Sequence, residues 1–235
     1  MKAQPGSTLV ALDLDGTIED SRADMVAAVH RVRQRRSLVP RPGDDFLPHI
    51  NRGMAHLYRH CFADALDAGH ALDEIAADYE AAYLAHIADT TELYPGMVGV
   101  LAELSELASL AVVTNKGERL SRALLDALGV LGHFAAVVGG DTCAEAKPSP
   151  LPLAFAATSC AVDPVGGRVF MIGDSAGDIR TGRALGATVI WCAWGYYDAP
   201  SQQAPDFTAY DPADLPRLVR EALAAAGPAT AKGGT

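Results

Sequence analysis

The sequence is short of positive charge. Its 235 residues contain 19 Lys and Arg against 29 Asp and Glu, which gives a formal net charge of −10. Binding to nucleic acid relies on many basic side chains that neutralise backbone phosphates. The arginines that do cluster, between residues 31 and 36, fit the C-terminal end of an amphipathic helix, where cations are favourable. We therefore do not expect nucleic acid as a partner.

Cysteines and long apolar runs are scarce as well. The four cysteines show no paired CxxC spacing, which favours structural thiols in a reducing compartment over a zinc site or a disulfide framework. The first eight residues are too few and too polar for a signal peptide, and no apolar run approaches the ~18 residues of a membrane span. We expect a cytoplasmic protein with no membrane partner; the sequence carries no signal for an oligomeric state.

Short apolar runs predict the strands of a parallel sheet. They consist mainly of Val, Ile, Leu and Ala, and they lie at residues 8–12, 110–113, 135–138, 169–172 and 188–192. Segments with helical periodicity, such as 97–107 and 120–128, lie between them. This alternation predicts right-handed βαβ units, and so an α/β fold with helices on both faces of the sheet.

One long segment breaks the alternation. Residues 21–89 contain helical patterns and no convincing strand, so we interpret them as a helical cap inserted after the first strand. The predicted core then comprises residues 1–20 and 90–228, and residues 229–235 are expected to form a flexible tail. An insertion at this point lies over the carboxyl end of the sheet, where ligands of α/β proteins bind.

The motif that carries most of the chemistry is DLDGT at residues 13–17, directly after the first predicted strand. Asp13 and Asp15, at positions i and i+2, can face the same side of the chain end. Asp13 can attack phosphorus as a nucleophile, while Asp15 protonates the leaving oxygen and later activates water. Gly16 permits a tight turn beneath a phosphate. The structural alternative is a polar turn that caps a helix.

Two carboxylates that face a phosphate require a cation. Like charges ~4 Å apart cost about 4 kcal/mol at an effective dielectric constant near 20. Mg²⁺ prefers oxygen ligands and bridges carboxylate to phosphate, so we predict it as the cofactor. Asp174 follows a later strand and is the predicted further ligand, with Asp178 behind it to orient the ligands. Helix capping is the alternative role for this second pair.

Three further residues are candidates for binding the phosphate. Thr114 and Asn115 follow the second core strand, where a hydroxyl and backbone N–H groups can hold phosphoryl oxygens. An N-cap is the alternative role for this segment, and the two roles are compatible. Lys147 follows the third strand, and its ammonium can balance the charge of the nucleophile or of the transferring phosphate.

These elements, in this order and each after a strand, resemble the motifs of the haloacid dehalogenase superfamily of phosphohydrolases. The segments most similar to its bacterial phosphoglycolate phosphatase branch are YPG at 94–96, VTNK at 113–116, GGD at 139–141, KPSPLPL at 147–153, IGDS at 172–175 and WGY at 194–196. The sequence departs from this branch at Ser149, where His is frequent, and at Glu19, where an apolar residue is common.

The resemblance implies a Rossmann-like, three-layer α/β/α core. It also implies Mg²⁺ held by Asp13, the backbone carbonyl of Asp15 and Asp174, and a phosphate contacted by Thr114 and Lys147. Asp15 distinguishes the chain from the dehalogenases that name the superfamily, which lack an acid there. The expected activity is hydrolysis of a small phosphate monoester through a phospho-aspartate, with 2-phosphoglycolate as the leading candidate.

The cap is expected to select the substrate. Within it, the segment NRGM at 51–54 resembles a glycine-containing loop that this branch points at the active site. Arg52 is a candidate to bind a substrate carboxylate bidentately, and Gly53 permits close approach of the backbone. The histidines His49, His56 and His60 lie near helical spacing but lack acids that would complete a metal site, so we expect them to pack on the cap.

Two other functions share this scaffold. A phosphomutase of the β-phosphoglucomutase type carries the same motifs, but it must protect its phospho-enzyme from water through closure of the cap. A non-catalytic binding protein of the same fold predicts a broken catalytic set, whereas Asp13, Asp15, Lys147 and Asp174 are all present.

Overall fold

The first strand, β1 (Thr8–Leu12), lies in the interior of the sheet, and all five of its residues are buried. The computed structural model describes residues 8–50, 52–166, 168–198 and 203–225, so the predicted tail at 229–235 lies outside the described residues. An uninterrupted apolar run such as TLVAL is typical of a strand that is covered on both faces.

A parallel sheet forms around β1 in the order β5-β4-β1-β6-β7-β8. Its other strands are β4 (Ser109–Val113), β5 (Ala136–Val138), β6 (Arg168–Gly173), β7 (Thr188–Cys192) and β8 (Phe207–Ala209), and every neighbouring pair is parallel. The predicted parallel α/β fold is confirmed. The edge strand β8 was not predicted, because three residues containing a threonine give no recognisable apolar run.

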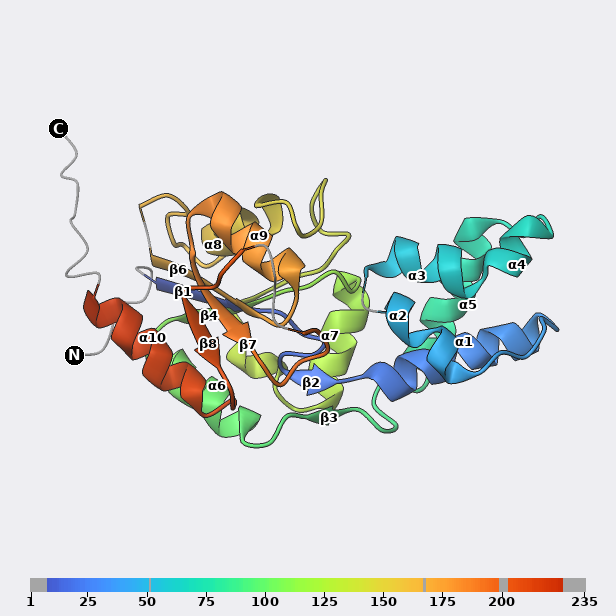
Figure 1. Ribbon diagram of the computed structural model, residues 1–235, viewed down its shortest axis with the longest axis horizontal. Helices are drawn as coiled ribbons and strands as arrows, with labels where there is room; N and C mark the ends of the chain where they lie inside the picture. Colours follow the sequence, from blue (N-terminus) through green and yellow to red (C-terminus); the bar gives the residue numbers. More distant parts are fainter. Residues whose placement is uncertain (1–7, 51, 167, 199–202, 226–235) are drawn as a thin grey trace.

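Helices cover both faces of the sheet, so the core has the three predicted layers (Figure 1). Alternate strand residues point to opposite faces: Val10 and Leu12 pack towards one set of helices, and Leu9 and Ala11 towards the other. The first set comprises α6 (Met97–Ser105), α7 (Glu118–Ala127) and α10 (Asp214–Ala225), and the second comprises α8 (Leu151–Ser159) and α9 (Ala176–Leu185). A short 3₁₀ helix, η2 (Leu131–His133), precedes β5.

The inserted segment forms a helical layer of its own on the right of Figure 1. Its regular elements are α1 (Arg22–Arg35), η1 (Gly43–Asp45), α2 (Leu47–Ile50), α3 (Met54–Cys61), α4 (Ala63–Asp67) and α5 (Leu72–Leu84). They enclose a separate apolar core that includes Val29, Phe46, Leu57 and Tyr79, each 0% exposed. No described helix of the protein is long and apolar enough to cross a membrane.

The two chain connections between core and cap are joined to each other. The strands β2 (Glu19–Asp20) and β3 (Glu92–Leu93) pair as a short antiparallel ribbon. Beside it, the buried carboxylate of Asp24 accepts hydrogen bonds of 2.7–2.9 Å from the backbone N–H and the hydroxyl of both Thr90 and Thr91. These four bonds hold the pKa of Asp24 below its usual value, although burial opposes the charged form. The predicted boundaries between core and cap, after residue 20 and after residue 89, both lie at this junction.

We predict that Asp24→Ala destabilises the protein by roughly 2–4 kcal/mol, because it leaves the buried donors of Thr91 and the partly buried donors of Thr90 without their charged acceptor. The measurement is urea unfolding of the full chain. Asp44→Ala is the matched control, since Asp44 is an exposed cap carboxylate, and it should change the free energy of unfolding by less than ~0.5 kcal/mol. Equal effects of the two substitutions would contradict the structural role given to Asp24.

Candidate active site

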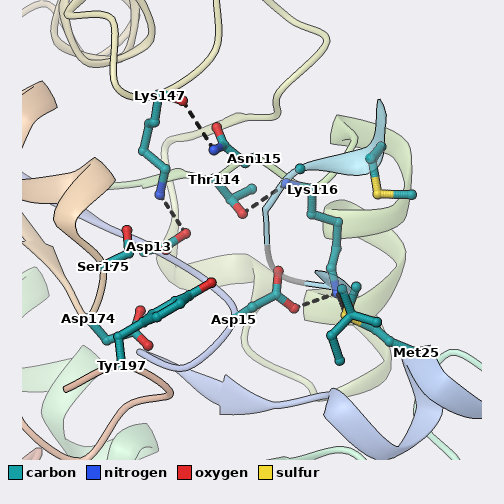
Figure 2. Close-up of a pocket in the computed structure, with 13 residues that line it drawn as sticks. Asp13, Asp15, Met25, Thr114, Asn115, Lys116, Lys147, Asp174, Ser175 and Tyr197 are labelled. Atoms are coloured by element: carbon teal, nitrogen blue, oxygen red, sulfur yellow. Dashed lines mark hydrogen bonds and ion pairs between the residues drawn. The ribbon is translucent and has the colours of Figure 1, made fainter. Parts of the chain in front are cut away.

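A pocket lies at the carboxyl ends of β1, β4 and β6, and residues from the cap close one side of it. The chain runs from β1 to β4 and β5 on one side and later to β6 on the other, so the order of the sheet reverses at β1. Ligands of open α/β sheets bind in the crevice at such a point. The lining residues are Asp13, Asp15, Met25, Ile50, Gly53, Met54, Thr114, Asn115, Lys116, Lys147, Asp174, Ser175 and Tyr197 (Figure 2).

The side chain of Asp13 points into this pocket towards the ammonium group of Lys147 (Figure 2). Lys147 Nζ lies 2.7 Å from Asp13 Oδ1 and 2.6 Å from Asp178 Oδ1, and only 2% of the lysine side chain is exposed. The backbone of Asp13 is fixed by its own hydrogen bond to the carbonyl of Ile172, which joins it to β6. One buried cation thus holds two carboxylates in place.

Negative charge at the site exceeds what Lys147 balances. Burial and the charge of Asp178 raise the pKa of Asp13 to about 7, although Lys147 lowers it. Burial and the charges of Asp13 and Asp178 raise the pKa of Asp174 to about 8. Since the ordinary pKa of an aspartate is about 3.9, these shifts show that the folded chain disfavours the ionised forms of both carboxyl groups.

The residues present fit a divalent cation. Asp13, Asp174 and Asp178 each place a carboxylate oxygen within 4.8 Å of the others. Asp174 Oδ2 accepts a hydrogen bond of 2.7 Å from the N–H of Tyr196, whereas its buried Oδ1 has no hydrogen-bond partner among the described residues. An orphaned buried carboxylate oxygen is costly unless a proton or a metal ion binds it. Oxygen ligands of this kind suit Mg²⁺.

Both carboxylate oxygens of Asp178 have partners, Lys147 on Oδ1 and Ser175 on Oδ2, whereas Asp174 keeps one oxygen without a partner among the described residues. Asp178 Oδ2 accepts hydrogen bonds from the N–H and the hydroxyl of Ser175, while Ser175 caps the N-terminus of α9. This reciprocal arrangement is a capping box, so the predicted capping role is present together with proximity to the acidic cluster. Orientation of the metal ligands by Asp178 stays a prediction, and its ion pair with Lys147 is the contact through which it would act.

Gly16 occupies a position that no larger residue fits. Its φ angle is +80°, and a Cβ added there would collide with the carboxylate of Asp174. Its N–H donates to the carbonyl of Glu19 at 2.9 Å, and Gly16 does not line the pocket. The structure therefore gives Gly16 the predicted turn, while a direct contact with phosphate stays a prediction.

We predict that Gly16→Ala lowers activity and Mg²⁺ affinity by at least roughly tenfold, because the new methyl group displaces Asp174. Gly186→Ala is the matched control: Gly186 has a similar φ of +76° but nothing within 4 Å of an added Cβ. Both substitutions should cost roughly 1 kcal/mol of backbone strain. The measurements are steady-state kinetics and Mg²⁺ titration of both variants. An equal loss of activity in Gly16→Ala and Gly186→Ala would contradict this account.

Asp15 makes a second, separate ion pair. Lys116 Nζ lies 2.6 Å from Asp15 Oδ1, and the hydroxyl of Ser21 donates to the same oxygen at 2.6 Å. Lys116 is held by Tyr83 of the cap, whose hydroxyl lies 2.9 Å from the ammonium. Burial opposes the charged form of Asp15, but Lys116 and the hydrogen bonds outweigh it and lower its pKa. Asp15 is therefore ionised at neutral pH.

We predict that Lys116→Met moves the acidic limb of the pH–rate profile to higher pH. Without the ammonium, the hydrogen bond from Ser21 remains, but the largest contribution that opposes burial is gone, so the pKa of Asp15 rises and the base form is lost at a higher pH. Below that pKa, kcat should fall roughly tenfold per pH unit. Lys116→Arg keeps the positive charge and serves as the control. An unchanged acidic limb in a folded Lys116→Met variant would contradict the pairing.

The two predicted phosphate-binding residues after β4 also face the pocket. The buried hydroxyl of Thr114 accepts a hydrogen bond of 3.2 Å from the N–H of Lys116. The amide of Asn115 donates to the carbonyl of Lys147 at 3.2 Å, and its Oδ1 has no hydrogen-bond partner among the described residues. Figure 2 shows both side chains beside Asp13 and Lys147. Their contact with phosphate stays a prediction.

The cap contributes Gly53 but not Arg52 to the pocket wall. Gly53 has a φ of +88°, and a Cβ added there would lie 3.8 Å from Cβ of Asn115, so this turn faces the core across the site. Arg52 is exposed and is not among the lining residues. The predicted substrate contact of Arg52 would therefore need a movement of the side chain or of the cap.

Several pocket residues were not predicted. The sequence places Lys116 only within the VTNK segment, and no local pattern indicates that its ammonium reaches back to Asp15. Tyr197 and the cap residues Met25, Ile50 and Met54 also line the pocket. The signal for Tyr197 in the sequence is its position next to the WGY segment. Glu19, which replaces the apolar residue common in the similar branch, is fully buried beside Asp15, and burial raises its pKa well above the usual value.

The parallel sheet, the acidic pocket at its carboxyl edge and the helical insertion define the class: an α/β enzyme whose site lies between a core and a cap. A family model for haloacid dehalogenase-like hydrolases matches residues 10–192. The chain belongs to this family, and the predicted superfamily is confirmed.

Relatives support the predicted branch. The chain is 36% identical over 215 residues to a phosphoglycolate phosphatase of Chromobacterium violaceum, with 90% of this chain and 96% of the relative covered. It is 37% identical to one of Caulobacter vibrioides, with 88% and 89% covered. A crystal structure of a predicted phosphoglycolate phosphatase from Haemophilus somnus is similar with a TM-score of 0.79 at 25% identity, covering 90% and 97%.

Proposed function

We propose that this hydrolase is a Mg²⁺-dependent phosphatase that removes the phosphate of 2-phosphoglycolate through a phospho-aspartate on Asp13. The observation that carries the proposal is the separation of the acidic residues into two environments. Asp13 lies with Asp174, Asp178 and Lys147, whereas Asp15 lies with Lys116. Carboxyl groups in environments that push their pKa values apart can take different roles in one reaction.

Asp13 is the proposed nucleophile. Its carboxylate faces the pocket, and Lys147 holds Oδ1 at 2.7 Å, which fixes the direction of the group. Attack by a carboxylate oxygen on phosphorus breaks the ester bond and leaves an acyl phosphate on the protein. The ammonium of Lys147 then balances negative charge as it spreads over the phosphoryl oxygens. Thr114 and Asn115 supply a hydroxyl and amide beside this position.

Asp15 is the proposed acid and base. Lys116 keeps it ionised in the resting state, which is the form that removes a proton from water when the phospho-enzyme is hydrolysed. Release of the alcohol requires the protonated form. A phosphate dianion close to Asp15 raises its pKa, so substrate binding favours protonation before the leaving group departs.

Asp13 and Asp174 are the proposed side-chain ligands of Mg²⁺, with the backbone carbonyl of Asp15 as a further ligand. Bound Mg²⁺ would supply positive charge that reduces repulsion between these carboxylates and the substrate phosphate. The orphaned Asp174 Oδ1 and the raised pKa values of Asp13 and Asp174 support this assignment. Gly16 is consistent with this assignment, because the absence of a side chain there leaves room for the carboxylate of Asp174.

The proposed substrate follows from the relatives and from the cap. The curated relatives at 36% and 37% identity are phosphoglycolate phosphatases. In this chain, Arg52 lies beside Gly53 on the turn that faces Asn115, so a movement of the cap would bring its guanidinium towards a substrate carboxylate.

The test is turnover of a panel of phosphate esters by the purified chain, including 2-phosphoglycolate and sugar phosphates, with Mg²⁺ and with chelator. We expect 2-phosphoglycolate to have the highest kcat/KM, chelator to abolish turnover, and Asp13→Asn to lower kcat by at least roughly 10³-fold. Asp44→Asn, at an exposed carboxylate of the cap, is the control. No turnover of any ester would overturn the proposal.

The substrate assignment has its own test. Arg52→Ala should raise KM for 2-phosphoglycolate by roughly tenfold or more and leave KM for esters without a carboxylate nearly unchanged, since it removes a bidentate contact to that group. Arg59→Ala, at another exposed arginine of the cap, is the control. A uniform increase of KM across all esters would contradict the assigned role of Arg52.

A further inference from the structure

Three histidines that the proposed reaction does not use converge on the surface of the cap. His49 lies on α2, while His56 and His60 lie on α3 at positions i and i+4, which places them on one face of that helix. One ring nitrogen from each of the three lies within 4.8 Å of those of the other two. The sequence suggested only that these residues pack on the cap.

The rings of the three histidines pack directly against one another. His49 Nδ1 lies 3.0 Å from His56 Nε2. Tetrahedral zinc, with Zn–N bonds of ~2.0–2.1 Å, holds neighbouring ligand nitrogens roughly 3.3 Å apart, so an ion that binds here displaces the proton shared by His49 and His56 and requires the rings to rotate. The rings of His56 and His60 stack with centroids 3.8 Å apart, and those of His49 and His60 lie 4.7 Å apart.

A backbone carbonyl orients the third ring. His60 Nδ1 lies 2.8 Å from the carbonyl oxygen of His56. Since a carbonyl only accepts, Nδ1 carries the proton, and the lone pair of His60 is on Nε2. Histidine ligands of metal ions are commonly fixed in this way, by a hydrogen bond from the nitrogen that does not bind the metal.

Burial and neighbouring charges favour the neutral form of His49 and His56. Burial, followed by the charges of His60, Arg52 and Arg41, lowers the pKa of His49, and burial with His60, His49 and Arg52 lowers that of His56. Neutral imidazole is the form that binds metal ions. Imidazole nitrogen suits ions such as Zn²⁺, Ni²⁺ or Cu²⁺, whereas Mg²⁺ and Ca²⁺ prefer oxygen ligands, so the donor set selects the former.

We propose that His49, His56 and His60 form a second metal site, which binds one late first-row divalent ion through three imidazole nitrogens. The site is distinct from the acidic cluster of Asp13 and Asp174, because it lies on the cap and offers nitrogen instead of oxygen ligands. An ion here joins α2 to α3. The helix α2 ends at Ile50 and α3 begins at Met54, and both of these residues line the pocket. Figure 1 shows the two helices next to each other in the cap.

The test is calorimetric titration of the untagged full chain with Zn²⁺ in excess Mg²⁺, which occupies the oxygen-ligand site. We expect one equivalent of Zn²⁺ to bind, and His56→Gln and His60→Gln each to weaken binding by roughly tenfold or more. His133→Gln, at a half-exposed histidine of the core, is the matched control and should bind as the wild type does.

Co²⁺ provides an independent readout, since its visible absorption reports the ligands of the ion. Co²⁺ added to the wild type in excess Mg²⁺ should give d–d bands that disappear in His56→Gln, while circular dichroism confirms that the variant is folded. Absence of Zn²⁺ binding, or equal Zn²⁺ affinity in wild type, His56→Gln and His60→Gln, would overturn the proposal.

Discussion

The repulsion among three buried carboxylates around a single ammonium is the constraint on which the rest of the site depends. Asp13, Asp174 and Asp178 converge within 4.8 Å, and Lys147 pairs directly with only two of them. Burial and mutual repulsion raise the pKa values of Asp13 and Asp174 to about 7 and about 8. A site of this charge is costly in the folded state, and it becomes favourable when a cation is bound.

The surrounding strands, turn and helix cap hold the carboxylates of Asp13, Asp174 and Asp178 close together despite their repulsion. Asp13 and Asp174 follow the parallel strands β1 and β6 and therefore lie at the same edge of the sheet. The pairing of β1 with β6 fixes the backbone on which both residues stand. Gly16 leaves space for Asp174, and Ser175 holds Asp178 in a capping box. On the other side of the pocket, Lys116 connects Asp15 of the core to Tyr83 of the cap. The position of the cap and the ionisation of Asp15 are thus physically linked.

Local chemistry explains which features could be predicted from the sequence. Asp13, Thr114 and Asp174 each lie at the end of an apolar run, and Lys147 lies in the loop after another one. Because the carboxyl ends of parallel strands meet at one edge, their proximity was predictable. The strand β8 was missed because its three residues carry no periodic signal. The pairing of Lys116 with Asp15 depends on the packing of the cap against the core, which no local pattern encodes.

The histidines of the cap also show that contacts set by packing cannot be predicted from sequence spacing alone. His56 and His60 have recognisable i, i+4 spacing, but His49 reaches them only because α2 folds back against α3. Likewise, the position of Arg52 at the turn was predicted from its neighbours, whereas its exposure outside the pocket depends on how the cap is placed over the sheet.

The most direct test of the central claim is thermal unfolding of the wild type and of Asp174→Asn, each with Mg²⁺ and with chelator at neutral pH. If carboxylate crowding dominates, Asp174→Asn without Mg²⁺ unfolds at a Tm several degrees above the wild type, about 1–3 kcal/mol more stable. Because Asp174→Asn also removes a proposed ligand of Mg²⁺, Mg²⁺ should raise the Tm of the wild type and leave that of the variant unchanged. A variant that is less stable than the wild type in chelator, and that still gains stability from Mg²⁺, would contradict the account.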